Sequence, residues 1–401
     1  MFLAGLSLPM ITIFLLASVI AIILSRGHLS HRLRVFARGA GRDTLLLMIW
    51  IFILAGAFAN SAKEMGSIAD MVNLTLAIVP SSAILAGLFL GATVISLSIG
   101  TSVGTIVAMM PIAVGIAQQL EESVPFVAAI IIGGAFFGDN LSFISDTTIC
   151  ATQSQGCKMS DKFRTNIRIA LPAAILVFIF YVFIGKDLNS PAVVGEINFW
   201  KVMPYLVVLI TAIAGINVLV VLVVGILLTG IVGMINGDYT ILSWSDAMGA
   251  GVVGMGELII ITMLAGGLLE VIRANGGIKF IMDKILRHVH SQRTAELSIA
   301  AMVSVVDMLT ANNTVAIITV AGLAKDISIR YHLDNRRVAS ILDTFSCIMQ
   351  GIIPYGAQLL MAAALAHCNP LDIIPHLYYT YALLIMSLLS IALRFPRSMK
   401  A

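Results

Sequence analysis

The chain has 401 residues, of which 59% are hydrophobic and only 11% are charged. The mean hydropathy of +1.01 is far above that of a soluble domain of this length, and no polar stretch is long enough to form one. The net charge of +3 does not indicate a nucleic-acid partner, because the basic residues lie in short segments between apolar spans. The composition therefore predicts an all-α polytopic membrane protein embedded in a lipid bilayer.

A membrane-spanning helix needs about 20 predominantly apolar residues, and the hydropathy pattern predicts about nine full spans. The uninterrupted candidates are, in chain order, 3–25, 44–62, 169–185, 202–216, 217–235, 254–272 and 377–394. Two longer zones are polar in the middle: 81–117 with 122–152, and 297–325 with 338–366. Each zone predicts a re-entrant hairpin followed by a broken transmembrane helix.

Short patterns of the first half of the chain recur in the second half at nearly one separation. Leu54-Ala55-Gly56 returns as Leu264-Ala265-Gly266, and the Thr-x-x-x-Thr of 101–105 returns at 310–314. Duplication of a membrane unit with polar breaks is typical of secondary transporters. The pattern predicts a first repeat over 1–199, a linking transmembrane helix over 200–216 and a second repeat over 217–401.

The basic residues predict the orientation of the chain. Of the 24 Lys and Arg residues, 21 lie in one set of loops or in the tail. These loops are 26–42, 153–168, 273–295 and 325–337. The positive-inside rule places them in the cytoplasm, with the N-terminus outside and the C-terminus inside, in a bacterial inner membrane. Matching loops of the two repeats then fall on opposite sides, which predicts inverted-topology repeats.

The centres of the two hairpins carry hydroxyl and amide side chains. Backbone that leaves a helix inside the membrane needs polar partners, so such breaks persist where they line a site. Oxygen atoms suit Na⁺, whereas helix N-termini suit anions. The alternative is that these residues only join helices by hydrogen bonds. The candidate substrate or cation ligands are Thr101, Ser102 and Thr105 in the first hairpin and Thr310, Asn312, Asn313 and Thr314 in the second, beside the carboxylate of Asp307.

The first broken helix carries two carboxylates, Asp139 and Asp146, seven residues apart. A charged side chain inside a bilayer costs at least about 2.5 kcal/mol, so both need a function or a partner. For Asp146 the alternative is that it caps the second half-helix. Seven residues are nearly two helical turns, so both carboxylates would lie on one face if the segment were helical throughout. The candidate Na⁺ site is Asp139, Asn140 and Ser142, and Thr147 is a further candidate ligand.

The second broken helix contains Asp343 and, further on, Gly351. Two alignments with the first helix are open, one that matches Asp343 to Asp139 and one that matches Gly351 to Gly138. Asp343 is a further candidate for coupling cations to protons, with the alternative that it pairs with Arg336 or Arg337.

The segment from Gly134 to Thr148, Gly-Ala-Phe-Phe-Gly-Asp-Asn-Leu-Ser-Phe-Ile-Ser-Asp-Thr-Thr, resembles the Gly-Asp-x-x-Ser-Pro-x-Ser-Asp-Thr-Thr signature of the NhaC-type Na⁺/H⁺ antiporter family. That family belongs to the ion-transporter superfamily with paired hairpins and broken helices. The Thr-Ser-x-Gly-Thr of 101–105 is similar to the family's first hairpin motif. Two departures are present: Phe143 stands where many members have proline, and 312–314 is closer to the hairpin tips of carboxylate carriers.

The leading hypothesis is a secondary transporter that exchanges Na⁺ for H⁺ by alternating access. Both ions would compete for Asp139, with Asp146, Asp307 or Asp343 in support. The alternative is a Na⁺- or H⁺-coupled carrier of an amino acid or small organic acid. No cofactor is expected, and enzyme motifs such as HExxH or a phosphate loop are absent from the sequence. The oligomeric state stays open, with a homodimer as one option.

Overall fold

The computed structural model describes residues 2–3, 6–7, 9–186, 188, 195–287 and 289–395. A two-residue antiparallel ladder joins β1 (Phe2–Leu3) to β2 (Leu6–Ser7). All other regular structure in the described residues is helical. Within the described residues, eight helices or continuous helix pairs are long and apolar enough to cross a membrane, or nine if the bent pair at 370–393 counts as one span. The predicted all-helical protein with about nine spans is confirmed.

The helices fall into two similar series on either side of α10 (Phe199–Ile213). The first series is α1 (Met10–Leu24), α2 (Leu29–Ala40), α3 (Asp43–Glu64), α4 (Ser67–Ile78), α5 (Ser81–Ile99), α6 (Ser102–Gln119), α7 (Val124–Leu141), α8 (Asp146–Gln155) and α9 (Met159–Gly185). The second is α11 (Val218–Ile235), α12 (Ile241–Gly254), α13 (Gly256–Ala274), α14 (Gly277–Leu286), α15 (Gln292–Thr310), α16 (Asn313–Arg330), α17 (Asn335–Ile352), α18 (Ala357–Ala366), α19 (Pro370–Ile373), η1 (Ile374–His376) and α20 (Tyr378–Leu393).

The two series keep one register in their central parts. Helices α5, α6, α7 and α8 begin at 81, 102, 124 and 146, and α15, α16, α17 and α18 begin at 292, 313, 335 and 357, so every start recurs at one constant offset. In both series a helical hairpin precedes a helix of 18 residues, a four-residue break and a helix of 10 residues. The opposite orientation of the two halves and the boundaries at 199 and 216 stay predictions.

Four segments that the sequence predicted as loops are helices, namely α2, α4, α12 and α14. They have 10 to 14 residues, which is too short to cross a membrane alone. In α2 and α14 basic residues alternate with apolar ones at helical spacing, as is typical of helices that lie on an apolar surface. Their charged side chains interrupt the apolar runs by which membrane-spanning helices are recognised, so the sequence predicted loops at these positions.

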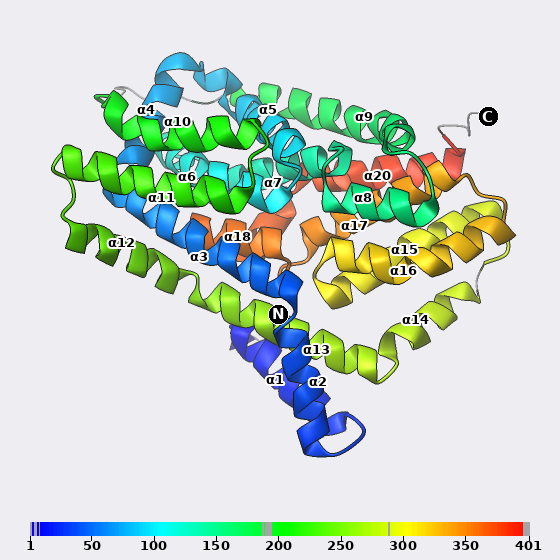
Figure 1. Ribbon diagram of the computed structural model, residues 1–401. Coiled ribbons are helices and arrows are strands. Elements are labelled where there is room, and N and C mark those ends of the chain that lie inside the picture. The colour runs from blue at the N-terminus through cyan, green and yellow to red at the C-terminus, as the bar shows by residue number, and fades with distance from the viewer. Residues whose placement is uncertain are drawn as a thin grey trace.

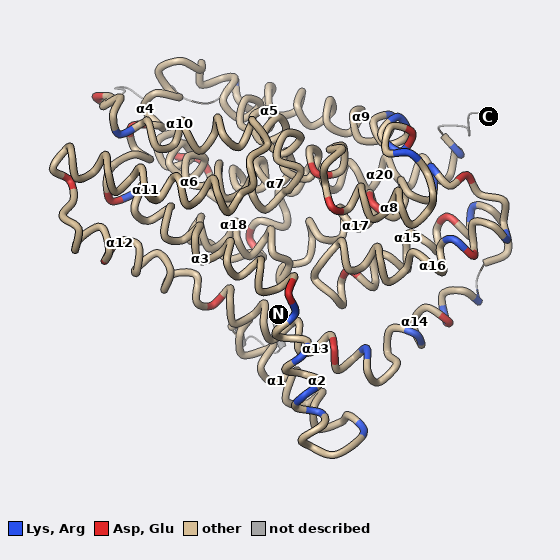
Figure 2. The backbone as a smooth tube through the Cα atoms, in the orientation of Figure 1, with Lys and Arg blue, Asp and Glu red and all other residues tan. Residues whose placement is uncertain are grey.

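The two broken helices lie between the two hairpins. In Figure 1, α8 and α17 lie between the hairpin α5–α6 and the hairpin α15–α16, and α12, α13 and α14 run along one edge. Helix α17 packs against both α15 and α7, while α18 packs against α6, so each part of the second broken helix contacts the first half. Lys and Arg gather mainly over α2, α14, the start of α9 and the end of α16 (Figure 2). The centre therefore joins the two series at their polar breaks.

Candidate functional site

The first hairpin turns between α5 and α6 within two residues. Gly100 has a φ of +74°, and a Cβ at this position would lie 2.5 Å from a side-chain carbon of Ile144. Thr101 is the extended N-cap of α6, and its carbonyl accepts a hydrogen bond of 3.0 Å from the Thr105 hydroxyl. Ser102 follows as the first helical residue and is 1% exposed. The turn thus buries the Ser102 hydroxyl at the helix N-terminus.

Two glycines bring the end of α7 against α5. A Cβ on Gly134 would lie 2.5 Å from the carbonyl oxygen of Phe89, and a Cβ on Gly138 would lie 2.3 Å from the Cβ of Ser96. The Ser96 hydroxyl donates a hydrogen bond of 2.5 Å to the carbonyl of Ala135. Small residues four positions apart let membrane helices approach backbone to backbone. This contact fixes the residue after Gly138 beside the hairpin.

That residue is Asp139, which is 5% exposed. Its Oδ2 accepts a hydrogen bond of 2.8 Å from the Ser102 hydroxyl, and its Oδ1 accepts one of 2.6 Å from Ser145, the N-cap of α8. The Ser145 hydroxyl also lies 2.9 Å from Oγ1 of Thr147. Asp139 forms no ion pair within the described part of the chain. Its charge is therefore offset by hydroxyl dipoles and not by a fixed cation.

A line of side-chain hydrogen bonds continues from this carboxylate into the second half. The Ser102 hydroxyl accepts a bond of 2.9 Å from Nε2 of Gln358, on α18. Oε1 of Gln358 in turn accepts a bond of 2.9 Å from Nε2 of Gln350, on α17. The same Nε2 donates a bond of 3.1 Å to the carbonyl of Ala311, in the turn of the second hairpin. The two hairpin tips are thus linked through the two glutamines.

The second hairpin turns at Ala311, whose φ is +48°. Asn312 is the N-cap of α16, because its Oδ1 accepts a hydrogen bond of 3.0 Å from the backbone N–H of Val315. Asn313 uses its Oδ1 in the same way, on the N–H of Thr314 at 3.0 Å. Both amide oxygens therefore accept backbone N–H groups at the start of α16.

Asp307 and Thr310 lie just before this turn on α15. Asp307 is fully buried, and neither carboxylate oxygen has a hydrogen-bond partner among the described residues. The Thr310 hydroxyl is used locally, since it donates a bond of 3.1 Å to the carbonyl of Asn312. A buried carboxylate without partners is costly as an anion, so Asp307 is the second place where the structure calls for a proton or a cation.

Asp343 lies in a separate buried cluster with the ammonium group of Lys162. The two side chains are 0% and 1% exposed and form an ion pair. The ammonium also donates to the carbonyl of Asn140 and, at 2.8 Å, to Oγ1 of Thr148. The amide of Asn166 contacts Asn140 and Oδ2 of Asp343, the latter at 3.4 Å. Asp343 therefore has a fixed cation and does not pair with the arginines on its own helix.

Those two arginines have other partners. Arg337 forms two hydrogen bonds to Glu296, of 2.6 and 2.9 Å, and Arg336 lies 3.9 Å from both Asp161 and Asp334. The alternative that Asp343 pairs with Arg336 or Arg337 is wrong, because α9 brings Lys162 into the protein interior. Lys162 belongs to a segment that the sequence placed in a cytoplasmic loop.

The three residues predicted as one Na⁺ site are not brought together. Asn140 projects about 100° away from Asp139 around the helix axis, and Ser142 lies beyond Leu141, the last residue of α7, so the three residues face different neighbours. Asn140 joins the Lys162 cluster, and the Ser142 hydroxyl donates a bond of 3.0 Å to the carbonyl of Leu97. Around Asp139 the oxygen atoms come from Ser102, Ser145 and Thr147.

Asp146 does not join the Asp139 cluster either. It is exposed in the first turn of α8, where Ser145 and not Asp146 is the N-cap. The structure thus separates the two carboxylates that the sequence placed on one helical face. The chain leaves the helix between them, so the seven-residue spacing does not put them on one side.

The threonine pairs of the two hairpins are not equivalent. Thr101 is the N-cap of α6, but the N-cap of α16 is Asn312, whereas Thr310 ends α15. The predicted match of Thr101 with Thr310 is therefore wrong by two residues. With the constant offset that relates the helix starts, Gln350 takes the place of Asp139. Neither alignment left open by the sequence, through Asp343 or through Gly351, holds.

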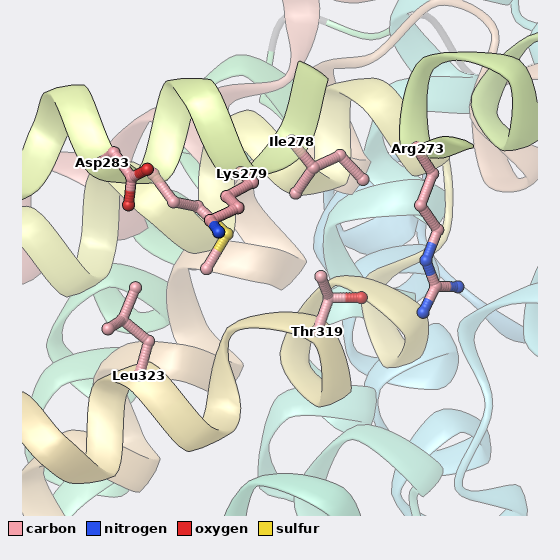
Figure 3. A pocket seen from close by; sticks show the side chains of 7 residues that line it. Arg273, Ile278, Lys279, Asp283, Thr319 and Leu323 are labelled. Carbon is pink, nitrogen blue, oxygen red and sulfur yellow. The ribbon is translucent and has the colours of Figure 1, made fainter. Parts of the chain in front are cut away.

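Two cavities border the second hairpin. One, of 280 Å³, lies between α13–α14 and α16, with Arg273 and Lys279 on one side and Thr319 and Leu323 on the other (Figure 3). The other, of 710 Å³, is formed mainly by apolar residues of α1, α13 and α18 and reaches Met308 beside the hairpin turn. The cavity beside the first hairpin, between α6, α10 and α11, measures only 10 Å³. The two larger of these three cavities thus border the second hairpin.

A family model supplies the decisive comparison. The model described as the Na⁺/H⁺ antiporter family matches residues 2–186 and 187–395. The chain belongs to this family. Antiporter-family membership agrees with the multi-pass helical fold and makes the protein a secondary transporter.

Individual relatives of this antiporter-family chain are distant. The Na⁺/H⁺ antiporter NhaC of Bacillus subtilis is 22% identical over 395 residues, which cover 89% of this chain and 84% of the relative. The malate-2H⁺/Na⁺-lactate antiporter of the same organism is 21% identical over 377 residues, covering 85% and 79%. Among solved structures, the YdaH transporter of Alcanivorax borkumensis has a TM-score of 0.47 at 11% identity, covering 96% of this chain and 99% of that one.

Sequence reasoning missed the residues that connect the predicted ones. Gln350, Gln358, Lys162 and Asn166 were not singled out, although all four are at most 4% exposed. Lys162 stands in the first turn of α9, where a charged start looks like the end of a loop. The two glutamines carried a weak signal, because they flank the Pro-Tyr-Gly break of the second broken helix. A polar residue beside a mid-membrane break is a candidate even when it is neutral.

Proposed function

We propose that the protein exchanges Na⁺ for H⁺ across the membrane at Asp139. The observation that carries this proposal is a buried carboxylate at the junction of a hairpin tip and a helix break. It accepts hydrogen bonds from two serine hydroxyls and forms no ion pair among the described residues. Carboxylate and hydroxyl oxygens are the ligands that hard cations such as Na⁺ prefer. Membership in the antiporter family supports Na⁺ and H⁺ as the transported ions.

Exchange follows from the charge of this one group. An uncompensated anion in a low-dielectric interior is costly, so Asp139 has to be occupied by a proton or by a cation. A proton removes the negative charge that Na⁺ needs, and bound Na⁺ occupies the oxygen atoms that a proton needs. The two ions therefore exclude each other, and each entry is linked to the release of the other. Alternating access of Asp139 to the two sides, by movement of one inverted repeat against the other, would complete the cycle.

Replacement of Asp139 by asparagine tests the proposal. Asparagine keeps the shape but not the charge, so Asp139→Asn should abolish Na⁺-dependent proton movement in proteoliposomes while the protein stays folded. The matched control is Asp146→Asn, an exposed carboxylate from the same helix break, which should keep exchange. If Asp139→Asn exchanges at the wild-type rate, the proposal is overturned and unpartnered Asp307 becomes the first candidate.

We place the protein in the bacterial inner membrane, with the N-terminus outside and the C-terminus in the cytoplasm. The support is the accumulation of Lys and Arg on one part of the molecule, over α2, α14, the start of α9 and the end of α16 (Figure 2). These elements belong to the four loops and flanking segments that hold most of the basic residues.

The second candidate function is coupled transport of a small organic acid. The cavity of 710 Å³ beside the second hairpin favours it, because this volume is in the range of small-molecule sites. One relative is named for malate and lactate transport. In such a carrier the amide N–H groups of Asn312 and Asn313 would bind the carboxylate of the solute.

The variant Asn313→Asp separates the two functions. It keeps an oxygen for the N–H of Thr314 but loses the amide donors and adds a negative charge. A carrier of organic acids should lose solute binding by a factor of about 30 or more, because an anion is repelled and unpaired. An antiporter should keep Na⁺ binding. Na⁺ transport that occurs only when an amino or organic acid is present would decide against the antiporter.

A further inference from the structure

We infer that Gln358 and Gln350 form a relay that transmits the protonation of Asp139 to the tip of the second hairpin. The inference rests on the proposed exchange at Asp139 and adds how the occupant of that site is communicated to the other half. It depends on a chain of three hydrogen bonds, from Gln350 through Gln358 and Ser102 to Asp139, that all run in the same direction.

The carboxylate sets that direction. A charged carboxylate only accepts hydrogen bonds, so the single proton of the Ser102 hydroxyl has to point to Asp139. The Ser102 oxygen can then only accept from Gln358, which turns Nε2 of Gln358 to the serine and Oε1 to Gln350. Gln350 must present its Nε2 to this oxygen, and the same Nε2 also holds the carbonyl of Ala311. The charged state of Asp139 thus fixes the amide that holds the hairpin turn.

Protonation of Asp139 removes this constraint. A protonated acid carries an O–H donor, and when it donates to Ser102 the serine proton turns to Gln358. Gln358 then presents Oε1 to Ser102 and Nε2 to Gln350, whose Oε1 has no partner in the described structure and becomes the acceptor. With its Oε1 turned to Gln358, Gln350 points Nε2 away from Ala311 and releases it. Bound Na⁺ leaves a carboxylate in place, so the hairpin stays held.

The position of Gln350 in the duplicated series supports this role independently. Gln350 and Asp139 occupy equivalent positions in the two series, because they are separated by the same number of residues as the starts of the matching helices. Each lies two positions before the end of its 18-residue helix. The second half thus has a neutral amide where the first half has the ionisable group. An amide cannot take up a proton or hold a charge at neutral pH, but it can donate and accept at once, as a relay requires.

The hairpin that the relay reaches has few other restraints at its turn. Beside the Gln350 contact, the Tyr355 hydroxyl donates a bond of 2.6 Å to the carbonyl of Met308, and Nδ2 of Asn312 donates a weak bond of 3.8 Å to the sulfur of Met48. The neighbouring cavity of 710 Å³ leaves space on one side of the turn. Loss of one of these hydrogen bonds should therefore change how readily the turn opens.

The other charged groups around Asp139 cannot replace the relay. The elements packed against α7 carry the Asp343–Lys162 pair on α17 and α9, the Cys347 thiol on α17 and the exposed Asp146 on α8. The ion pair is already neutral as a unit. Within the described contacts, only the serine and glutamine chain joins Asp139 to the hairpin turn.

Alkylation of a cysteine beside the turn tests the relay. Met308 is 45% exposed, so Met308→Cys can be introduced into a chain in which the four native cysteines are replaced, and its reaction rate with a maleimide can be measured. At fixed pH, saturating Na⁺ displaces the proton and should slow the reaction about threefold or more relative to choline. Gln358→Leu should make the rate the same in both salts, because leucine neither donates nor accepts. Gln350→Leu is the second relay variant. It lacks the amide that holds Ala311, so it should react at the fast rate both in Na⁺ and in choline.

The matched control is Gln155→Leu. Gln155 is also a buried glutamine that donates to a backbone carbonyl of the second hairpin, that of Ala321 at 3.2 Å, but it has no link to Asp139 among the described contacts. This variant should keep the Na⁺ effect, whereas a Na⁺ effect that persists in Gln358→Leu, or vanishes in Gln155→Leu, overturns the relay.

A Na⁺-dependent rise in the unfolding temperature of the purified protein reports ion binding separately. It should persist in Gln358→Leu and vanish in Asp139→Asn. If the wild-type protein itself lacks this rise, the proposed exchange at Asp139 fails and the relay fails with it.

Discussion

The buried ion pair of Lys162 and Asp343 permits a quantitative test of how the centre is held together. In Lys162→Met the methionine fills a similar volume but removes the ammonium group and its contacts to Asp343, Asn140 and Thr148. Asp343 then keeps a single hydrogen bond to Oδ2, of 3.4 Å from Asn166, and its Oδ1 already has none in the described structure. Removing one partner of a fully buried pair costs about 3–5 kcal/mol.

The double variant separates the loss of packing from the loss of charge. In Lys162→Met combined with Asp343→Leu no unpaired charge remains, so we expect most of the stability to return, to within about 1–2 kcal/mol of the wild type. The surface pair Lys201–Asp238 is the control, because its side chains are 21% and 23% exposed at an N–O distance of 2.7 Å. Lys201→Met should cost no more than about 1 kcal/mol.

Equilibrium unfolding in mixed micelles, followed by circular dichroism as the denaturing detergent is increased, measures all four free energies. A cost below about 1 kcal/mol for Lys162→Met would show that water or a bound ion reaches Asp343, and the cluster would then not be a dry ion pair. A double variant no more stable than Lys162→Met would show that packing and not charge explains the loss.

Two further predictions concern the positioning of the site and the orientation of the chain. Gly138→Ala should destabilise the protein by about 1–3 kcal/mol and slow Na⁺/H⁺ exchange, because the added Cβ would meet Ser96 on α5. The control is Gly87→Ala on α5, where an added Cβ meets nothing within 4 Å. This variant should change neither the free energy of unfolding nor the exchange rate. Cysteines at Arg34 and Arg336 should be labelled only from the cytoplasm and one at Thr240 only from outside, and labelling of position 336 in intact cells by an impermeant maleimide would refute the inverted topology.

The sequence predicted the fold well because the bilayer imposes simple rules. Apolar length identified the spans, and the polar centres of two zones located both hairpin turns and both helix breaks, at Gly100, Ala311, Ser142 and Ile353. The short helices α2 and α14 were missed because their charged faces shorten the apolar runs on which such rules depend.

The site was predicted only in part because its contacts join distant segments. Asp139 stood out as a carboxylate in an apolar span, but its neighbours Ser145 and Gln358 depend on where the helices break and cross. Lys162 and Asp343 belong to different halves of the chain, and without the fold nothing pairs them. The shift of two residues between the hairpins is not visible in the sequence either, because the two Thr-x-x-x-Thr spacings are the same although the helix N-caps, Thr101 and Asn312, do not match in them.

The close contact of α5 with α7 limits how the protein can move. Gly134 lies against the backbone of Phe89, and Gly138 against Ser96, with less space than a single methyl group. Sliding one helix along the other would drive side chains into backbone atoms, so shear between them is blocked. If the first hairpin and its broken helix move during transport, they therefore move together as a rigid body, and the displacement occurs at an interface that contains free volume. The surroundings of α15 and α16 provide such an interface.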